Sequence, residues 1–262
     1  MNTKSKKSPS LPSNLYSEEY FLSSCEGYTE FTATNGSELS VRLEKALDYA
    51  CIQSGMKILD IGCGRGEMIN ACSDLGANAV GIDYADAAIS LTKSLKTNQK
   101  VSLSDAKSLP FPNNFFDRVL ILDVVEHLYP WELNKVLKQI FRVLSPEGQL
   151  IVHTAPNVWY DRYAYPIVRI IRKISGKGAL YPKNPRGLNV AANLDVHVNE
   201  QSALSLWLAL YKSGFVSKVW LDSPIQNRSE SLFLSFIRKV LFGLPPFRWF
   251  FQREIFAVAK RK

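Results

Sequence analysis

The sequence predicts a doubly wound α/β fold, in which helices cover both faces of a mostly parallel sheet. Three observations predict it. Short apolar runs alternate with amphipathic stretches of helical length from Met56 onward, a glycine cluster follows the first of these runs, and aspartates follow the next three. The chain has 262 residues, which is enough for one such domain with insertions.

Seven segments have the apolar or alternating pattern of strands: 56–61, 78–82, 101–104, 116–122, 149–154, 215–221 and 253–259. Helices are expected over 38–54, 86–95, 131–144 and 199–213, where apolar residues recur on one face. Ser145–Gly148 is expected to form a turn, and Gly214 to end the last of these helices.

The net charge of +8 is distributed unevenly. Residues 1–150 carry 15 basic and 18 acidic side chains, whereas residues 151–262 carry 17 and 6. No apolar run approaches the ~20 residues of a spanning helix, which excludes an integral membrane protein of that kind. The polar, basic first residues contain no apolar stretch, so we expect no secretory signal and a cytoplasmic location.

The glycine cluster is the most informative motif. Gly62, Cys63, Gly64 and Gly66 directly follow the first strand, which contains Asp60, and they open a helix. Glycines are needed where the backbone turns sharply and approaches a ligand that a Cβ would block. The spacing G-x-G-x-G departs from the G-x-G-x-x-G fingerprint of dinucleotide sites, which disfavours a nicotinamide-dependent dehydrogenase.

Aspartates stand at the ends of the following strands. Asp83 ends the second strand, Asp105 follows the third, and Asp123 follows the fourth. Each alone could be a turn or helix-cap residue. Because the carboxyl ends of parallel strands meet at one edge of the sheet, we expect them to line a common ligand crevice, with Asp83 placed to hold ribose hydroxyls.

These motifs resemble those of a known family. LDIGCGRG, the end of VGIDY, SDAKSLPFPNNFFDRV, LDVVEHL and LSPEGQLIV are similar to the successive motifs of class I S-adenosylmethionine-dependent methyltransferases, of the type 11 group that includes quinone and glycan methyltransferases. The resemblance covers residues 54–154. It implies a Rossmann-like seven-stranded sheet, parallel with an antiparallel last strand, with inserted cap or lid segments, and S-adenosyl-L-methionine as the cofactor.

The resemblance also implies which residues bind that cofactor. Asp60 and the backbone of Gly62, Cys63, Gly64 and Gly66 would face the methionine moiety, and Asp123 would lie under its end. Asp83 would bind the ribose hydroxyls, with Tyr84 next to the adenine. Asp105 and the backbone N–H of Ala106 would meet the adenine ring.

His127, four residues after Asp123, is the candidate catalytic base for an acceptor hydroxyl. The alternative is a structural imidazole that packs beneath the cofactor. Asp123-x-x-Glu126-His127 also resembles the E-x-x-E-H metal set of ubiquinone-pathway O-methyltransferases. We expect no metal, because Glu-His at this position is widespread in the type 11 group. His153 and His197 are expected to be polar wall residues.

The basic charge gathers in two stretches that the core does not need. One lies at 156–198, where isoleucines at 167, 170, 171 and 174 share a helical face opposite basic residues, and the other at 223–252. These stretches could form a cover over the active site with a packed apolar face. They could also bind an anionic membrane surface through 161–175 and 231–251. Nucleic acid is disfavoured because aliphatic residues separate the charges.

The sequence therefore divides into a disordered tail (1–14), an N-terminal helical lid (15–55), a cofactor-binding core (56–155) and a basic amphipathic acceptor-side insertion (156–198). The rest of the core (199–262) contains a second insertion at 223–252. We expect a methyltransferase for a hydrophobic or lipid-linked small molecule, of quinone, lipid or glycan type, acting most readily at oxygen. It would lie on the inner face of the membrane. A methyltransferase for a soluble natural product and an inactive cofactor-binding partner protein are the alternatives.

Overall fold

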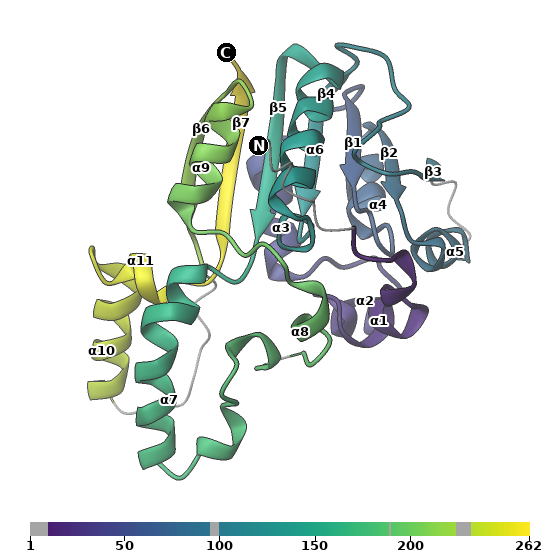
Figure 1. The fold of residues 1–262 in the computed structure, drawn as a ribbon. Coiled ribbons are helices and arrows are strands. Elements are labelled where there is room, and N and C mark those ends of the chain that lie inside the picture. Colours follow the sequence, from purple (N-terminus) through teal and green to yellow (C-terminus); the bar gives the residue numbers. More distant parts are fainter. Residues whose placement is uncertain (1–9, 95–99, 189, 224–231) are drawn as a thin grey trace, which may run out of the picture.

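The computed structural model describes residues 10–94, 100–188, 190–223 and 232–262 (Figure 1). Its centre is a seven-stranded sheet in the order β3-β2-β1-β4-β5-β7-β6. The strands are β1 (Lys57–Ile61), β2 (Asn78–Asp83), β3 (Lys100–Leu103), β4 (Phe116–Leu122), β5 (Leu144–Thr154), β6 (Phe215–Leu221) and β7 (Ile255–Arg261). The pairs from β3 to β5 are parallel, and β7 is antiparallel to both neighbours. The predicted fold class is confirmed.

Helices cover both faces of this sheet. On one face α6 (Pro130–Val143) and α9 (Ala203–Lys212) bury aliphatic side chains against β4, β5 and β7. On the other, α4 (Glu67–Asp74) packs against β1 and β2, α3 (Val41–Ala50) packs against β4, β5 and β7, and α5 (Asp86–Ser94) contacts β2 and β3. β1 and β4 are buried almost throughout, as expected of parallel strands covered on both sides.

The carboxyl ends of the parallel strands all point to the lower end of the molecule in Figure 1, where short helices gather. They are α1 (Glu18–Ser23), α2 (Tyr28–Thr34) and α8 (Asn193–Val196), with a 3-10 turn, η1, at Ser13–Leu15 and another, η2, at Val125–His127. The first insertion adds a π-helical turn at Tyr160–Ala164 and α7 (Tyr165–Ile174), and the 3-10 turns η4 (Gly178–Leu180) and η5 (Pro185–Gly187) follow. The second adds α10 (Leu232–Gly243) and α11 (Arg248–Phe251).

Some element boundaries differ from the prediction. The helix expected over 199–213 begins at Ala203, because the Ser202 hydroxyl caps it by accepting the backbone N–H of Ser205. The turn predicted at Ser145–Gly148 is wrong: β5 continues through these residues, with a register shift against β4 between Phe116 and Arg118. The last strand lies two residues later than predicted.

The expected disordered tail extends partly into the described chain. Residues 1–9 lie outside the described residues. Residues 10–14 make defined contacts: the Ser10 hydroxyl donates to Glu132 at 2.5 Å, and the carbonyl of Leu11 accepts the Tyr84 hydroxyl at 2.7 Å. This part of the chain therefore lies along the strand ends.

Candidate cofactor and acceptor site

A cavity of about 670 Å³ lies at the carboxyl ends of the parallel strands, under the N-terminal helices. Its lining includes ten of the eleven residues predicted for the site: Asp60, Gly62, Cys63, Gly64, Asp83, Tyr84, Asp105, Ala106, Asp123 and His127. Gly66 is not in the lining; it is the left-handed N-cap residue of α4. The fold thus brings together residues that are up to 67 positions apart in the sequence.

The glycine loop forms one wall of the cavity, and its conformation explains its residues. Gly62 and Gly64 have φ of 73° and 51°, a region that favours glycine. A Cβ on Gly62 would also overlap the side chain of Val124. The backbone N–H of Gly64 donates to the Asp83 carboxylate at 3.1 Å, so that the second strand end fixes the loop.

The two innermost carboxyl groups of the cavity differ in their partners. Asp83 also accepts the backbone N–H of Ala85 at 2.9 Å, and burial raises its pKa. Asp60 makes no hydrogen bond through its side chain among the described residues, and burial with the nearby charges of Asp83 and Glu67 raises its pKa to about 7. A buried carboxyl group without a partner suits a cationic group of a ligand.

The other strand ends complete the cavity. Asp105 accepts the backbone N–H of Lys107 at 2.8 Å and pairs with its ammonium at 3.0 Å, which leaves lone pairs toward the cavity. Tyr84 donates its hydroxyl to Leu11, and its ring meets the ring of Tyr16 edge-on at 5.7 Å. A ligand in this region would therefore lie against tyrosine rings from two segments.

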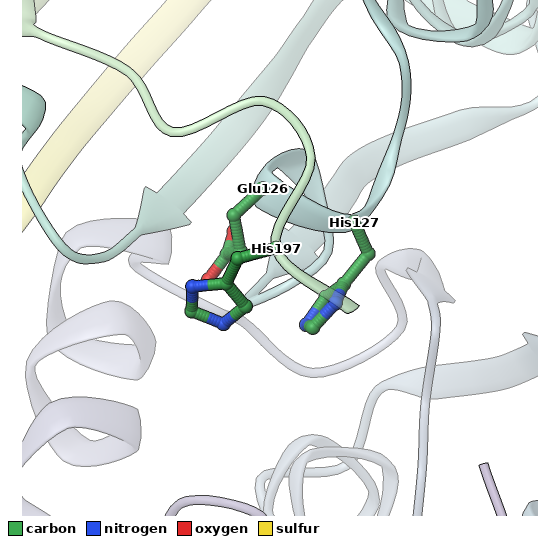
Figure 2. Close-up of side chains that lie close together, drawn as sticks. All are labelled: Glu126, His127 and His197. Atoms are coloured by element: carbon green, nitrogen blue, oxygen red, sulfur yellow. The ribbon is translucent and has the colours of Figure 1, made fainter. Parts of the chain in front are cut away.

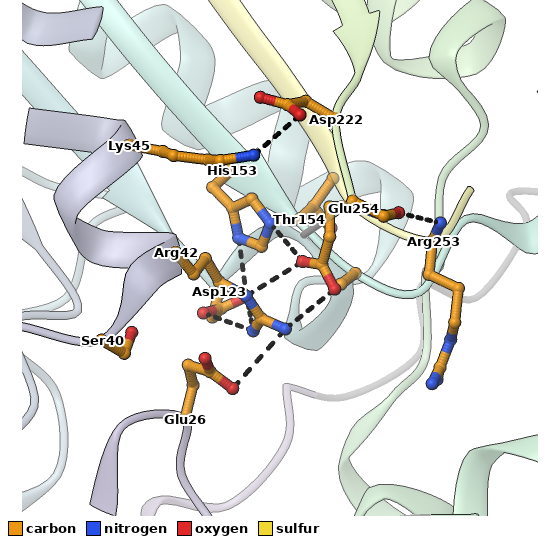
Figure 3. Close-up of polar contacts among 12 residues, drawn as sticks. Glu26, Ser40, Arg42, Lys45, Asp123, His153, Thr154, Asp222, Arg253 and Glu254 are labelled. Carbon is orange, nitrogen blue, oxygen red and sulfur yellow. Dashed lines mark hydrogen bonds and ion pairs between the residues drawn. The ribbon is translucent and has the colours of Figure 1, made fainter. Parts of the chain in front are cut away.

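Asp123 lines the cavity, and its carboxylate also takes part in an ion-pair network (Figure 3). Both of its carboxylate oxygens accept from Arg42 Nη1, at 3.0 and 3.1 Å, and one of them lies 2.9 Å from His153 Nδ1. Arg42 also pairs with Glu254 at 2.9 Å and with Glu26 at 3.6 Å. These charges hold the pKa of Asp123 well below its usual range and lower that of Glu254 to about 2.

His153 is not the polar wall residue that the sequence predicted. It is fully buried outside the cavity lining, and its Nε2 is 2.8 Å from the Glu254 carboxylate. Burial lowers its pKa, but the two flanking carboxylates, Asp123 first, overcome this and raise it to about 9. The imidazole is therefore a cation that joins the ends of β4, β5 and β7.

Sequence reasoning missed Arg42, Glu254 and Arg65. Arg65 is buried and donates to the backbone oxygens of Phe21 and Glu26, which ties the N-terminal helices to the glycine loop. Two of the partners of Arg42, Asp123 and Glu254, lie 81 and 212 residues away in the sequence. No local sequence pattern indicates contacts between residues so far apart. Arg65 could have been noticed, because it lies inside the glycine motif.

His127 lies in η2 and lines the cavity. Its Nδ1 is 3.1 Å from the carbonyl oxygen of Val196. Because a carbonyl only accepts, Nδ1 carries the proton, and Nε2 keeps its lone pair in the neutral ring. Burial and then the neighbouring His197 lower the pKa of His127 to about 3, so the ring is neutral at physiological pH.

Glu126, His127 and His197 come together in Figure 2, with one potential ligand atom of each within 4.8 Å of the others. These three could hold a metal ion. They differ from the set considered from the sequence, since His197 from the first insertion takes the place of Asp123. Glu126 already accepts the Thr154 hydroxyl at 2.7 Å. The expectation that no metal is used stays a prediction.

The fold and the cavity define a class: doubly wound α/β domains that hold a ligand at the carboxyl ends of their parallel strands. Residues 59–152 match the profile of the family described as "Methyltransferase domain". Over residues 59–152 the chain is therefore similar to the methyltransferase-domain family.

Two curated relatives resemble this chain over less than half of its length. The chain is 30% identical over 108 residues to a probable S-adenosylmethionine-dependent methyltransferase of Mycolicibacterium smegmatis, covering 41% of each chain. It is 32% identical over 108 residues to the ubiquinone biosynthesis O-methyltransferase of Bartonella tribocorum, covering 40% of this chain and 43% of that protein. The chain thus spans about two-fifths of the length of these curated relatives.

A crystal structure of a SAM-dependent methyltransferase from Archaeoglobus fulgidus has a TM-score of 0.56 and 21% identity, covering 84% of this chain and 91% of that one. This likeness extends beyond the segment matched by the family profile and concerns the fold.

The charged state of His153 predicts how stability depends on pH. A pKa raised from 6.5 to about 9 means that the stabilisation is complete below pH 6.5 and is lost as the pH rises through 9. We expect the free energy of unfolding in urea to fall by up to ~3 kcal/mol across this window. His153→Gln should be less stable at neutral pH and should lose most of this slope. A variant that keeps the full slope would contradict the assignment.

Proposed function

We propose that this protein transfers a methyl group from S-adenosyl-L-methionine to a hydrophobic or lipid-linked small molecule, most readily at an oxygen atom. The observation that carries the proposal is the cavity, in which the glycine loop and three strand-end carboxyl groups from β1, β2 and β3 face one space. An apolar acceptor fits the tyrosine-lined side of the same cavity, where Tyr16 meets His127 edge-on at 5.6 Å.

The residues fit the cofactor on chemical grounds. Asp60 offers a buried carboxylate to its ammonium group, and the N-terminal end of α4 with the backbone N–H groups of the loop offers donors to its carboxylate. Asp83 keeps acceptor capacity on each oxygen for the ribose hydroxyls, and Asp105 and Ala106 would meet the adenine edge beside Tyr84. When bound, the sulfonium supplies an activated methyl group.

The chain then has to align the acceptor oxygen with that methyl group. Alignment alone can lower the barrier by about 7–11 kcal/mol in favourable cases. His127 Nε2 can accept the acceptor's hydroxyl proton as a hydrogen bond, and it takes that proton as the oxygen becomes positively charged on methylation. The oxygen is then strongly acidic, so a base with a pKa of about 3 is sufficient.

The choice of acceptor rests on two supports. A similar protein is named for ubiquinone biosynthesis, and a demethylmenaquinone methyltransferase of Paenarthrobacter aurescens is 24% identical over 195 residues, covering 71% of this chain and 70% of that protein. The cavity lining around His127 also contains the rings of Tyr16 and His197. A soluble natural product remains the second candidate acceptor, and a cofactor-binding partner without catalysis is the non-enzymatic alternative.

Substitution of Asp83 tests the cofactor site. We expect Asp83→Asn to weaken binding of S-adenosylhomocysteine by at least ~tenfold, since it loses charge-assisted hydrogen bonds to the ribose. The matched control is Asp86→Asn, an exposed aspartate three residues later that does not line the cavity. Calorimetry measures both. Equal affinities of the two variants, or binding of NAD by the parent protein, would contradict the assignment.

Substitution of His127 tests the acceptor side. His127→Ala should slow methyl transfer to a membrane extract by about 10²-fold while leaving the affinity for S-adenosylhomocysteine unchanged. Initial rates should be insensitive to prior dialysis against a chelator. Loss of transfer after dialysis, with recovery on addition of a divalent ion, would instead assign a metal to Glu126, His127 and His197.

A further inference from the structure

Helix α7 turns its apolar face away from the protein. Ile167, Ile170, Ile171 and Ile174 are between 51% and 83% exposed and share one face by their spacing. The opposite, basic face holds the helix to its own chain. Arg169 Nε donates to the carbonyl oxygen of Tyr181 at 3.2 Å, and the Arg172 guanidinium lies 5.5 Å from the centre of the Tyr181 ring. A cover over the active site would pack the other way round.

The two insertions leave the sheet at the same end of their strands. Thr154, where the first insertion begins, pairs with Ile255, and Ile255 pairs with Leu221. The two insertions touch each other: the Phe250 ring stacks on Trp159 at 5.6 Å and meets Tyr163 edge-on at 5.7 Å. Figure 1 shows α7, α10 and α11 together at this end of the molecule.

The second insertion also exposes large apolar side chains. We call the combined set the apolar surface; it consists of Ile167, Ile170, Ile171, Ile174, Leu180, Phe236, Leu244, Phe247 and Trp249, all of them exposed. Exposed apolar side chains gathered on neighbouring elements mark a contact site in proteins that are otherwise soluble. No helix in the described ranges is long and apolar enough to cross a bilayer.

The charges around the apolar surface identify what it contacts. Residues 162–183 and 232–251 contain nine basic and no acidic side chains. Arg162, Lys173, Lys177 and Lys239 are exposed among them. A second copy of this chain would bring the same cations against one another without a counter-charge. An anionic lipid surface supplies both phosphate groups for the cations and an acyl layer for the isoleucines.

We propose that α7, α10 and α11 dock this protein onto anionic phospholipid bilayers, with the apolar surface inserted at the level of the headgroups. The bases of the insertions reach the cavity, because Ala155, Pro156 and Arg253 are part of its lining. Docking therefore brings the bilayer to the acceptor side of the cavity. It does not depend on which acceptor is methylated.

Flotation with phosphatidylcholine vesicles, with and without phosphatidylglycerol, tests the proposal. The parent protein should float with the phosphatidylglycerol vesicles at low salt and stay largely unbound with phosphatidylcholine alone. Ile170→Glu combined with Ile171→Glu should lower the partition coefficient at least ~tenfold. Val216→Glu, an exposed valine at the far end of β6, is the matched control and should bind as the parent does.

Charge substitutions separate the two parts of the interaction. Arg162→Glu, Lys173→Glu and Lys177→Glu together should abolish the preference for phosphatidylglycerol. All variants should retain the parent's affinity for S-adenosylhomocysteine, which shows that they are folded. The proposal is overturned if the parent binds neither kind of vesicle or if the isoleucine variant binds as well as Val216→Glu. It is also overturned if light scattering shows a parent dimer that the isoleucine variant dissolves. No outcome requires methyl transfer, so failure here is distinct from failure of the proposed function.

Discussion

The site depends on one arginine in the cavity wall, whose side chain is 18% exposed. Arg42, on α3, lies among the carboxylates of Asp123, Glu254 and Glu26, and the charged His153 completes the network. Asp123 follows β4, His153 belongs to β5 and Glu254 immediately precedes β7. Removing one partner leaves an uncompensated charge in a site that is largely shielded from solvent, which destabilises the fold. The network therefore holds the ends of β4, β5 and β7 and the N-terminal segment that carries Glu26 and Arg42 in one arrangement.

This arrangement also positions the cavity. Asp123 has a φ of 53°, a conformation unusual for a residue with a side chain, and its ion pairs hold it there. The next residues form η2, which carries Glu126 and His127 into the acceptor side. The backbone oxygen of Glu126 accepts the N–H groups of Val198 and Asn199 at 2.9 and 3.0 Å, so η2 in turn anchors the end of the first insertion. A continuous chain of contacts therefore links the strand ends, η2 and the end of the first insertion.

The core and its cavity could be predicted from the sequence because both follow from local pattern. Apolar periodicity located the strands, and the carboxyl ends of parallel strands necessarily meet. The positions of Asp60, Asp83 and Asp105 along the chain were therefore enough to predict that they share one cavity. Arg42 and Glu254 could not be found in this way, since their contact joins residues 212 positions apart. The role of His153 depends on the same long-range contacts.

In the second half of the chain, the sequence pattern predicted the helix but not its surroundings. Amphipathic spacing predicted the apolar face of α7 correctly, but spacing does not say whether such a face is packed or exposed. In the structure Tyr181 contacts the basic face of α7, and the apolar face is therefore exposed. The positive charge of the chain thus belongs to the insertions, while the carboxyl groups of the core face the cavity. The structure thus has an acidic cavity in the core and a basic, apolar surface on the insertions.

The most direct test of the account follows the transferred methyl group. The protein is incubated with S-adenosylmethionine labelled on its methyl group and with a total cell extract, which is then separated into organic and aqueous phases. The account predicts that label enters a small molecule of the organic phase, and that the Asp83→Asn protein transfers far less. Label confined to the aqueous phase would contradict a hydrophobic acceptor, and cofactor binding without any transfer would contradict the enzyme itself.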